Sequence, residues 1–205
     1  MQIKSKKELD FYIKADRMMN RGVFCWSIKQ KLLHLLFPDY IMSYLKAMRC
    51  VSYYRGLGGA LSKIMFVLYY RKFQRLGMKL GFSIGCDTLG YGVVIPHWGT
   101  IVVGGSNRIG NYAVLHTSTC LTDDGKIIGD AVYISTGVKI VSKLKLGNGI
   151  SIGANSLVNK SHDGDNAMLA GMPAKVIKDS ETWYIRDHRE DKVRKIEDLK
   201  KRLAI

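Results

Sequence analysis

The sequence predicts a mainly β protein with flanking helices, in which short parallel strands wind into a coil. Apolar residues recur every six positions in the middle of the chain, and helical spacing marks both of its ends. We therefore expect a basic helical N-terminal subdomain over residues 1–80, a β-helix over 81–178 and a charged C-terminal helix over 179–205.

The six-residue period carries the fold prediction. The anchors form two series, with one extra residue between them: Ile109, Leu115 and Leu121, then Ile128, Ile134, Ile140, Leu146, Ile152 and Val158. Six residues match neither the helical nor the simple strand period. A coil of three short strands, each with its turn, would direct the anchors inward and stack them into an apolar column. Glycine follows several anchors, as at Gly110 and Gly129, and we expect it to supply the dihedral freedom of a tight corner.

The first eighty residues contain start and stop signals for several helices. Ser5 and Glu8 have the spacing of a capping box, which opens a helix that ends near Gly22. A second helix should end before Pro38, and a third should begin at Asp39. Glycines over 56–59 interrupt the pattern, and a last helix carries residues 64–76.

The charge is concentrated in this helical region. The chain has 32 Lys and Arg against 17 Asp and Glu, a net charge of +15. Residues 1–80 hold 16 basic and 4 acidic residues, which leaves +12 there. An anionic membrane surface, nucleic acid, an anionic ligand and a solvated basic face are all compatible with this charge. No nucleic-acid-binding motif accompanies it, so we expect no nucleic-acid partner.

Other features narrow the class of protein. The 4 cysteines are scattered without a CxxC pair, which favours free thiols in a reducing cytosol over a disulfide framework or a zinc site. The apolar stretch 64–70 is too short to cross a bilayer, and no signal-peptide pattern is present. We expect a cytoplasmic protein, with the inner face of the membrane as a candidate contact of the basic region. An apolar stripe on the C-terminal helix should pack on the end of the coil or on another subunit.

Three segments, together with the repeats, resemble the hexapeptide-repeat acyltransferases of the serine acetyltransferase type. They are 96–104 (PHWGTIVVG), 152–160 (IGANSLVNK) and 170–175 (AGMPAK). The resemblance implies a left-handed parallel β-helix, a homotrimer, and acetyl-CoA as acyl donor in a groove between subunits. The 95–100 segment (IPHWGT) is similar to the branch found in surface-polysaccharide gene sets. The implied acceptor is therefore a sugar hydroxyl of a glycan precursor, free or lipid-linked; the alternative is serine O-acetyltransferase of cysteine biosynthesis.

The same resemblance assigns catalytic residues. His97 aligns with the family's general base, and an imidazole with a pKa near 6.5 suits that role at neutral pH. His116 is the second candidate, to orient the acceptor or assist the base. Where the family places an orienting Asp fifteen residues before the base, this chain has Phe82, and Asp87 is a substitute candidate. The family's serine-binding Arg-His-Pro is also missing, which favours a sugar acceptor.

The expected donor site uses small residues and cations. The resemblance implies that Gly137 and Ala154 approach the pantetheine arm, and that Asn159, Lys160 and Lys175 meet the nucleotide end. A zinc carbonic anhydrase or a non-catalytic scaffold could use the same coil. A zinc site needs about three protein ligands, however, and no third ligand accompanies the two histidines in sequence, so we expect no metal.

Overall fold

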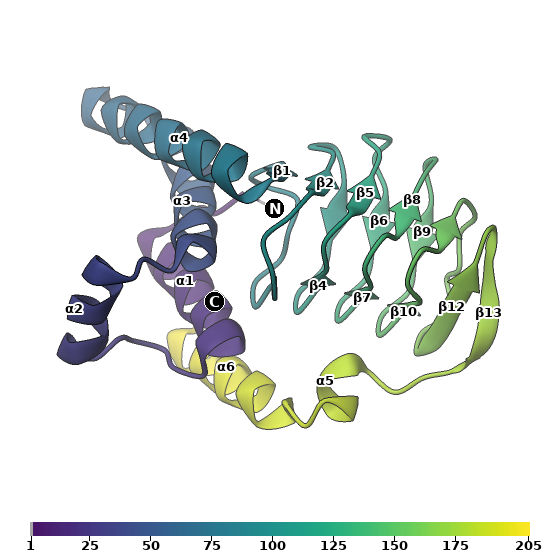
Figure 1. The fold of residues 1–205 in the computed structure, drawn as a ribbon. Helices are drawn as coiled ribbons and strands as arrows, with labels where there is room; N and C mark the ends of the chain where they lie inside the picture. The colour runs from purple at the N-terminus through teal and green to yellow at the C-terminus, as the bar shows by residue number, and fades with distance from the viewer. Residues whose placement is uncertain (1) are drawn as a thin grey trace.

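A computed structural model describes residues 2–205 of the chain. Four helices come first and two last, with a coil of short strands between them (Figure 1). The helices are α1 (Lys6–Arg21), α2 (Ile28–Leu36), α3 (Tyr40–Arg55), α4 (Ala60–Leu80), α5 (Trp183–Arg186) and α6 (Glu190–Leu203).

The predicted ends of α1 and α2 and the start of α3 are confirmed, whereas α4 extends four residues beyond the predicted 64–76 at each end. The Ser5 hydroxyl accepts a hydrogen bond from the Glu8 backbone N–H at 3.0 Å, and Gly22 closes α1 with a left-handed φ of 75°. The Glu8 carboxylate accepts from the backbone N–H of Lys4 at 2.8 Å, so the capping box is shifted by one residue. Asp39 caps α3, because its Oδ1 accepts from the backbone N–H of Met42 at 3.1 Å.

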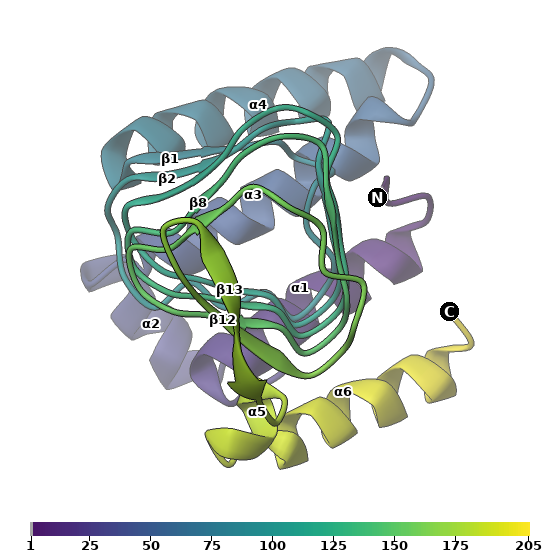
Figure 2. The same cartoon turned by 90° about the vertical axis from the view of Figure 1, so that its right-hand side faces the viewer.

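The strands form three sheets that wrap around a common axis. The first sheet contains β1 (Phe82–Ile84), β2 (Ile101–Val103), β5 (Thr119–Leu121), β8 (Lys139–Ile140) and β11 (Leu157–Val158). The second contains β4 (Val114–Leu115), β7 (Tyr133–Ile134), β10 (Ser151–Ile152), β12 (Ala167–Gly171) and β13 (Ala174–Asp179). The third contains β3 (Arg108–Ile109), β6 (Ile127–Ile128) and β9 (Lys145–Leu146). The view along the axis shows the three-sided cross-section (Figure 2).

Neighbouring strands are parallel, and each coil lies one step along the axis from the previous one. Leu115 pairs with Ile134 and Ile109 with Ile128, so each anchor stacks on the anchor of the next coil. All nine predicted anchors are buried, at 4% exposure or less. The predicted apolar column is therefore confirmed. The terminal pair β12–β13 is antiparallel and closes the far end of the column.

The glycines after the anchors have a different role from the one expected. Gly110 and Gly129 do not adopt the left-handed conformation; at the corner that follows them, Tyr112 and Ala131 do, with φ of 58° and 57°. A Cβ on Gly129 would lie 2.7 Å from the carbonyl carbon of Gly147 in the next coil. These positions require glycine because adjacent coils approach each other closely, and dihedral freedom is not the reason.

The C-terminal region differs from the single helix expected over 179–205. Asp179 ends β13, and the helical part is divided into α5 and α6 by residues 187–189. The stripe on α6 packs beside α1 and against the first coils of the same chain (Figure 1). There the Tyr91 hydroxyl donates to the Glu197 carboxylate at 2.9 Å, and Tyr112 donates to the same oxygen.

A buried ion pair fixes the helical region to the first coil. Arg49 Nε lies 2.9 Å from Asp16 Oδ2, and both side chains are 1% exposed. Arg49 also donates to the carbonyl oxygen of Leu89 at 2.7 Å, and Asp16 accepts from the backbone N–H of Val93 at 3.1 Å. Because these partners lie on α1, α3 and the first coil, the pair sets the position of the helices relative to the solenoid.

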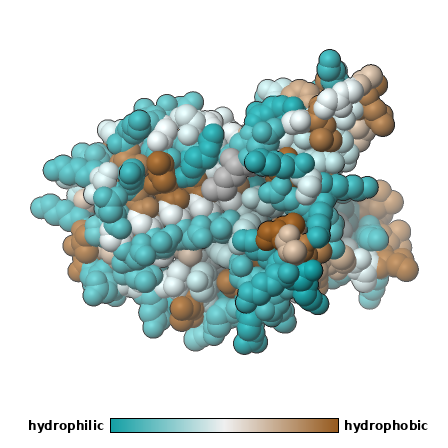
Figure 3. Space-filling view, turned by 180° about the vertical axis from the view of Figure 1, so that it is seen from behind, coloured by the Kyte–Doolittle hydropathy of each residue, from teal (hydrophilic) through white to brown (hydrophobic). Residues whose placement is uncertain are grey.

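Two helices at the N-terminal end of the solenoid project from the body. α2 and the first half of α4 project outward from one end of the solenoid, and β12 and β13 lie at the other end (Figure 1). Seen from behind, both projections carry hydrophobic side chains at the surface (Figure 3). Within residues 2–205, the structure contains no helix with the length and hydropathy that a membrane span requires.

Candidate active site

His97 lies in an enlarged turn between the second and first sheets. Val94 pairs with Val114, and Ile101 pairs with Thr119. Ile101 comes seven positions after Val94, whereas Thr119 comes only five positions after Val114. The first coil therefore has two extra residues at this corner. They carry His97 outward, and its side chain is exposed.

His116 lies one coil further along the same corner, close enough to His97 for their charges to interact. Partial burial lowers the pKa of His116, and the charge of His97 lowers it further. His116 Nε2 is 2.8 Å from the hydroxyl oxygen of Tyr133, which comes from the following coil. Burial raises the pKa of Tyr133, so the phenol stays protonated and can donate to a neutral imidazole.

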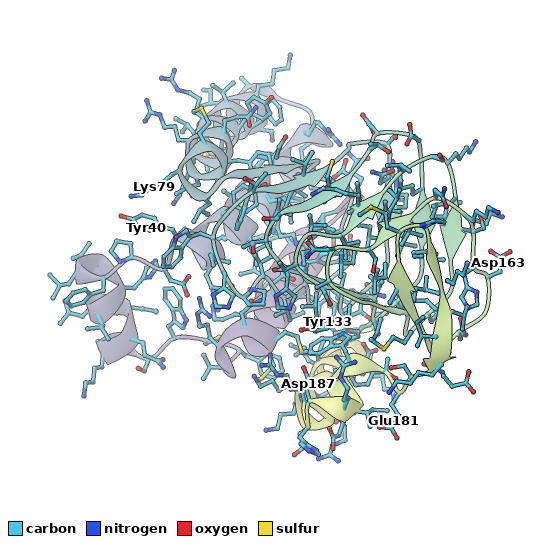
Figure 4. All side chains as sticks on the ribbon, turned by 45° about the vertical axis from the view of Figure 1, so that its right-hand side comes forward. Tyr40, Lys79, Tyr133, Asp163, Glu181 and Asp187 are labelled. Atoms are coloured by element: carbon cyan, nitrogen blue, oxygen red, sulfur yellow. The ribbon has the colours of Figure 1, made fainter. Side chains whose placement is uncertain are left out.

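The C-terminal segment supplies charged neighbours to this group. The guanidinium carbon of Arg186 lies 5.0 Å from the centre of the Tyr133 ring, and Arg186 Nε is 3.3 Å from Asp187 Oδ1. Asp187 counteracts the lowering of the His116 pKa. Tyr133 and Asp187 face the same region in the side-chain view (Figure 4). Trp183 anchors α5 here by donating from its indole N–H to the carbonyl oxygen of Tyr112 at 2.8 Å.

Sequence reasoning did not identify Tyr133 or Asp187. The repeat contained a signal for Tyr133, because it precedes the anchor Ile134 as Val114 precedes Leu115, on the coil next to His116. Asp187 left no such signal, since it reaches the corner only through the return of the chain after β13.

A cavity of about 490 Å³ lies beside the turn that carries His97. Pro96 and Trp98, the two neighbours of His97, form one wall, and Trp98 is 74% exposed. Tyr40 and Lys79 contribute from the helical region, with the Lys79 ammonium 3.6 Å from the centre of the Tyr40 ring (Figure 4). The remaining lining residues are Arg21, Pro38, Asp39, Ile41 and Leu80.

Phe82, which stands in place of the family's orienting Asp, and Asp87, the substitute candidate, have different environments. Phe82 lies on β1 and is buried in the hydrophobic core, whereas Ser83 on the same strand is exposed. Counting fifteen residues back therefore reaches an inward position, because strand side chains alternate between faces. Asp87 forms an ion pair with Arg55 and lines a second cavity, of about 750 Å³, beneath α4.

The corner that begins at His97 continues along the solenoid as a row of turns. β4, β7, β10 and β12 all end at it, and β2, β5, β8 and β11 begin from it. Gly137 and Ala154 lie in its successive turns, and Lys175 pairs with Ala170 at its far end. Ala154 and Lys175 are exposed. The structure thus arranges His97, His116 and these three residues along one edge.

Asn159 and Lys160 lie elsewhere on the terminal coils. They follow β11 and belong to the next corner, where both are exposed. Residues 2–205 contain no group of three or more His, Cys, Asp or Glu side chains arranged to hold a metal ion.

Comparison with curated proteins relates the chain to serine acetyltransferases. No family model matches it. It is 30% identical over 132 residues to the serine acetyltransferase of Bacillus subtilis, covering 56% of this chain and 60% of that protein. It is 28% identical over 96 residues to that of Synechococcus elongatus, covering 43% and 39% of the two chains. The chain thus matches about two fifths to three fifths of the length of these relatives.

Solved structures show the same fold. The serine acetyltransferase of Brucella abortus superimposes with a TM-score of 0.60 at 21% identity, covering 86% of this chain and 69% of that one. A serine acetyltransferase in complex with CoA gives a TM-score of 0.55 at 23% identity, covering 82% and 68%. The predicted left-handed parallel β-helix is therefore confirmed.

The sequence similarity and the shared fold agree with each other. The segments that predicted the resemblance lie on the solenoid, which is also the part of the chain that positions the two histidines. In sequence and in fold, the chain resembles the hexapeptide-repeat acyltransferases of the serine acetyltransferase type.

Proposed function

We propose that this chain is an acetyl-CoA-dependent O-acetyltransferase. The observation that carries the proposal is the placement of His97 and His116 at one end of a corner whose later turns contain small residues and Lys175. The curated relatives are named serine acetyltransferases, and one fold neighbour is a complex with CoA. Both support the same reaction class.

In this proposal His97 is the general base. Its imidazole takes the proton of the acceptor hydroxyl while the oxygen forms a bond to the carbonyl carbon of the thioester. Collapse of the tetrahedral intermediate breaks the carbon–sulfur bond, and the imidazolium returns its proton to the departing thiolate. The products are an acetyl ester and CoA. His116, hydrogen-bonded to Tyr133, would orient the acceptor or hold His97 in position.

The proposed donor site follows the corner from His97 toward Lys175. Adjacent strands lie about 4.8 Å apart, so the four steps from the first to the last coil cover about 19 Å, a length suited to an extended pantetheine arm. Gly137, which is half-buried, and Ala154, which is exposed, are small residues along this line, and Lys175 can pair with phosphate at its end. Asn159 and Lys160 would approach the nucleotide from the neighbouring corner. In a homotrimer, a second protomer would form the other wall of this groove.

L-Serine is the acceptor that the comparisons support best, because the curated relatives are named for it. A sugar hydroxyl of a glycan precursor is the second candidate. The cavity beside His97 favours the sugar, since the aromatic faces of Trp98 and Tyr40 can pack on a sugar ring and the volume of about 490 Å³ is large for a free amino acid.

A thiol-release assay tests the function. Purified protein, acetyl-CoA and a panel of acceptors that includes L-serine, N-acetylglucosamine and UDP-N-acetylglucosamine should yield acceptor-dependent free CoA. His97→Ala should lower the rate at least a hundredfold while calorimetric binding of CoA is retained. His162→Ala, a histidine outside the proposed site, is the matched control. Full activity in His97→Ala would refute the assignment of the base, and the absence of transfer to every acceptor would refute the function.

A further inference from the structure

Helix α2 presents its apolar face to solvent. Ile28, Leu32 and Leu35 lie at i, i+4 and i+7 on one side of the helix, and they are 86%, 63% and 75% exposed. Leu33, Leu36 and Phe37 are also exposed, at 54%, 69% and 74%. Eight of the nine residues of α2 are exposed, and the ninth, His34, is half-buried. A helix of a soluble domain normally turns such a stripe toward the core.

The orientation of α2 is fixed from its other side. The ring of His34 lies 4.2 Å from that of Trp26, and His34 Nδ1 accepts from the backbone N–H of Asp39 at 2.9 Å. Ser27 and Gln30 form a reciprocal capping box that starts the helix. At 100° per residue, His34 is nearly opposite the side shared by Ile28 and Leu32. The contacts that hold α2 therefore point its apolar side outward.

Basic residues accompany this apolar face. Lys29 and Lys31 flank the stripe on its two sides, where their alkyl chains can lie along an apolar surface while the ammonium groups reach anions. From residue 17 to residue 86 the sequence has twelve Lys and Arg and a single acidic residue, Asp39. An apolar stripe with flanking cations is the pattern of helices that lie in the interface of an anionic bilayer.

The first half of α4 adds a second exposed apolar surface at the same end of the molecule. Leu61, Ile64 and Leu68 are 73%, 56% and 57% exposed. Further along the helix, Arg71, Lys72 and Arg75 are exposed. α2 and this part of α4 project from the end of the solenoid opposite β12 and β13 (Figures 1 and 3).

We propose that α2, together with the first half of α4, docks this protein on an anionic lipid surface. The apolar stripe enters the boundary between headgroups and acyl chains, and the lysines and arginines contact lipid phosphates. The charge distribution disfavours a two-fold contact of this surface with a second copy of the chain. A two-fold contact places the same surface on both sides, so the basic residues would face each other with few carboxylates to offset them.

Vesicle co-sedimentation tests the proposal on the full-length protein. We expect binding to vesicles of phosphatidylcholine with phosphatidylglycerol, weak binding to phosphatidylcholine alone, and a decrease with added NaCl. Leu35→Glu should lower the partition coefficient at least tenfold. Ile127→Glu, at a 53% exposed apolar position on the solenoid, should leave it unchanged. Melting temperatures of both variants should match the native protein, because both side chains are solvent-exposed.

A charge pair gives a second, independent measurement. Lys29→Gln/Lys31→Gln should weaken binding by about fivefold per lysine, whereas Lys143→Gln/Lys145→Gln, with the same spacing on the solenoid, should have no effect. Equal binding by Leu35→Glu and the native protein would overturn the proposal, as would equal binding to neutral and anionic vesicles. A third outcome would also overturn it: the native protein does not bind vesicles but self-associates with increasing concentration, and Leu35→Glu abolishes that association. The apolar face of α2 would then contact a second copy of the chain. None of these measurements depends on acetyl transfer, so they test membrane docking independently of the proposed enzymatic function.

Discussion

His116 Nε2 lies 2.8 Å from the hydroxyl oxygen of Tyr133, and this hydrogen bond connects two consecutive coils at the candidate active site. Tyr133 is in turn covered by Arg186 and Trp183 of α5, with Arg186 also donating to the Ser151 hydroxyl at 3.3 Å. The geometry thus connects the second histidine of the site to a helix near the C-terminus.

Removing the hydroxyl group of Tyr133 should change the kinetics if its hydrogen bond to His116 supports catalysis. Tyr133→Phe keeps the ring and deletes the partner of His116, so we expect kcat to fall about tenfold while KM for acetyl-CoA stays the same. Steady-state assays of both substrates measure the two effects. Tyr70→Phe, which removes an exposed hydroxyl on α4, is the control. An unchanged kcat in Tyr133→Phe would show that His116 acts without this contact.

The titration of His116 should report its two charged neighbours. Partial burial first, and then His97, lower the pKa of His116 below its ordinary value of 6.5, whereas Asp187 raises it. His97→Asn should therefore raise the pKa of His116, and Asp187→Asn should lower it further. Proton NMR of the imidazole resonances between pH 4 and 8 measures both shifts. Shifts of the opposite sign would refute the proximity of these groups.

The same lowered pKa has a consequence for stability. Because the folded protein binds a proton at His116 less readily than the unfolded chain, the contribution of this group to stability is present above pH 6.5 and is lost as the pH falls through the folded pKa. Replacing His116 with Gln should flatten this part of the pH dependence of the melting temperature. An identical profile in native protein and variant would contradict the prediction.

The wall of the cavity beside His97 should discriminate between substrates. Trp98→Ala removes a 74% exposed indole that lines the cavity, so KM for the acceptor should rise by up to about tenfold. KM for acetyl-CoA should not change. Leu61→Ala, a comparably exposed apolar position on α4, is the control. If only the KM for acetyl-CoA changed, this cavity would not be part of the acceptor site.

The buried pair between α1 and α3 should dominate the stability of the helical region. Asp16→Ala leaves the Arg49 guanidinium buried without its carboxylate and should reduce the free energy of unfolding by about 3–5 kcal/mol. The exposed pair Asp10–Lys14, with side chains 60% and 27% exposed, supplies the comparison. Asp10→Ala should cost less than about 1 kcal/mol. Urea titration followed by circular dichroism measures both, and equal losses would argue against the assigned role of Asp16.

Close approach of adjacent coils can be tested at two glycines that differ in their surroundings. A Cβ at Gly129 would lie 2.7 Å from backbone atoms of Gly147, whereas one at Gly105 would meet nothing within 4 Å. Gly129→Ala should destabilise the protein by about 1–3 kcal/mol, and Gly105→Ala should be neutral or slightly stabilising. Calorimetric melting temperatures would reveal any reversal of this order.

Several features of the site were predictable because they repeat or have local causes. The anchors from Ile109 to Val158 identified the inward positions, and His97 was identified from the segment that contains it. Phe82, at the position of the family's orienting Asp, is turned inward by the alternation of β1, so it offers no polar group to His97. Of the two neighbours of His116, Tyr133 could have been found from the repeat, because it precedes the anchor Ile134 as Val114 precedes Leu115. Asp187 could not, because it reaches this corner only through the returning C-terminal segment.

The sequence by itself determined the coil and the helix ends, because a six-residue apolar period and local capping residues act over a few positions of the chain. The tertiary structure alone decided which polar side chains meet, which cavity lies beside His97 and which face of α2 stays in solvent. These outcomes depend on how coils stack and on how helices pack across long separations in sequence. No local pattern encodes them, because the contacts that fix them form only when the whole chain is folded.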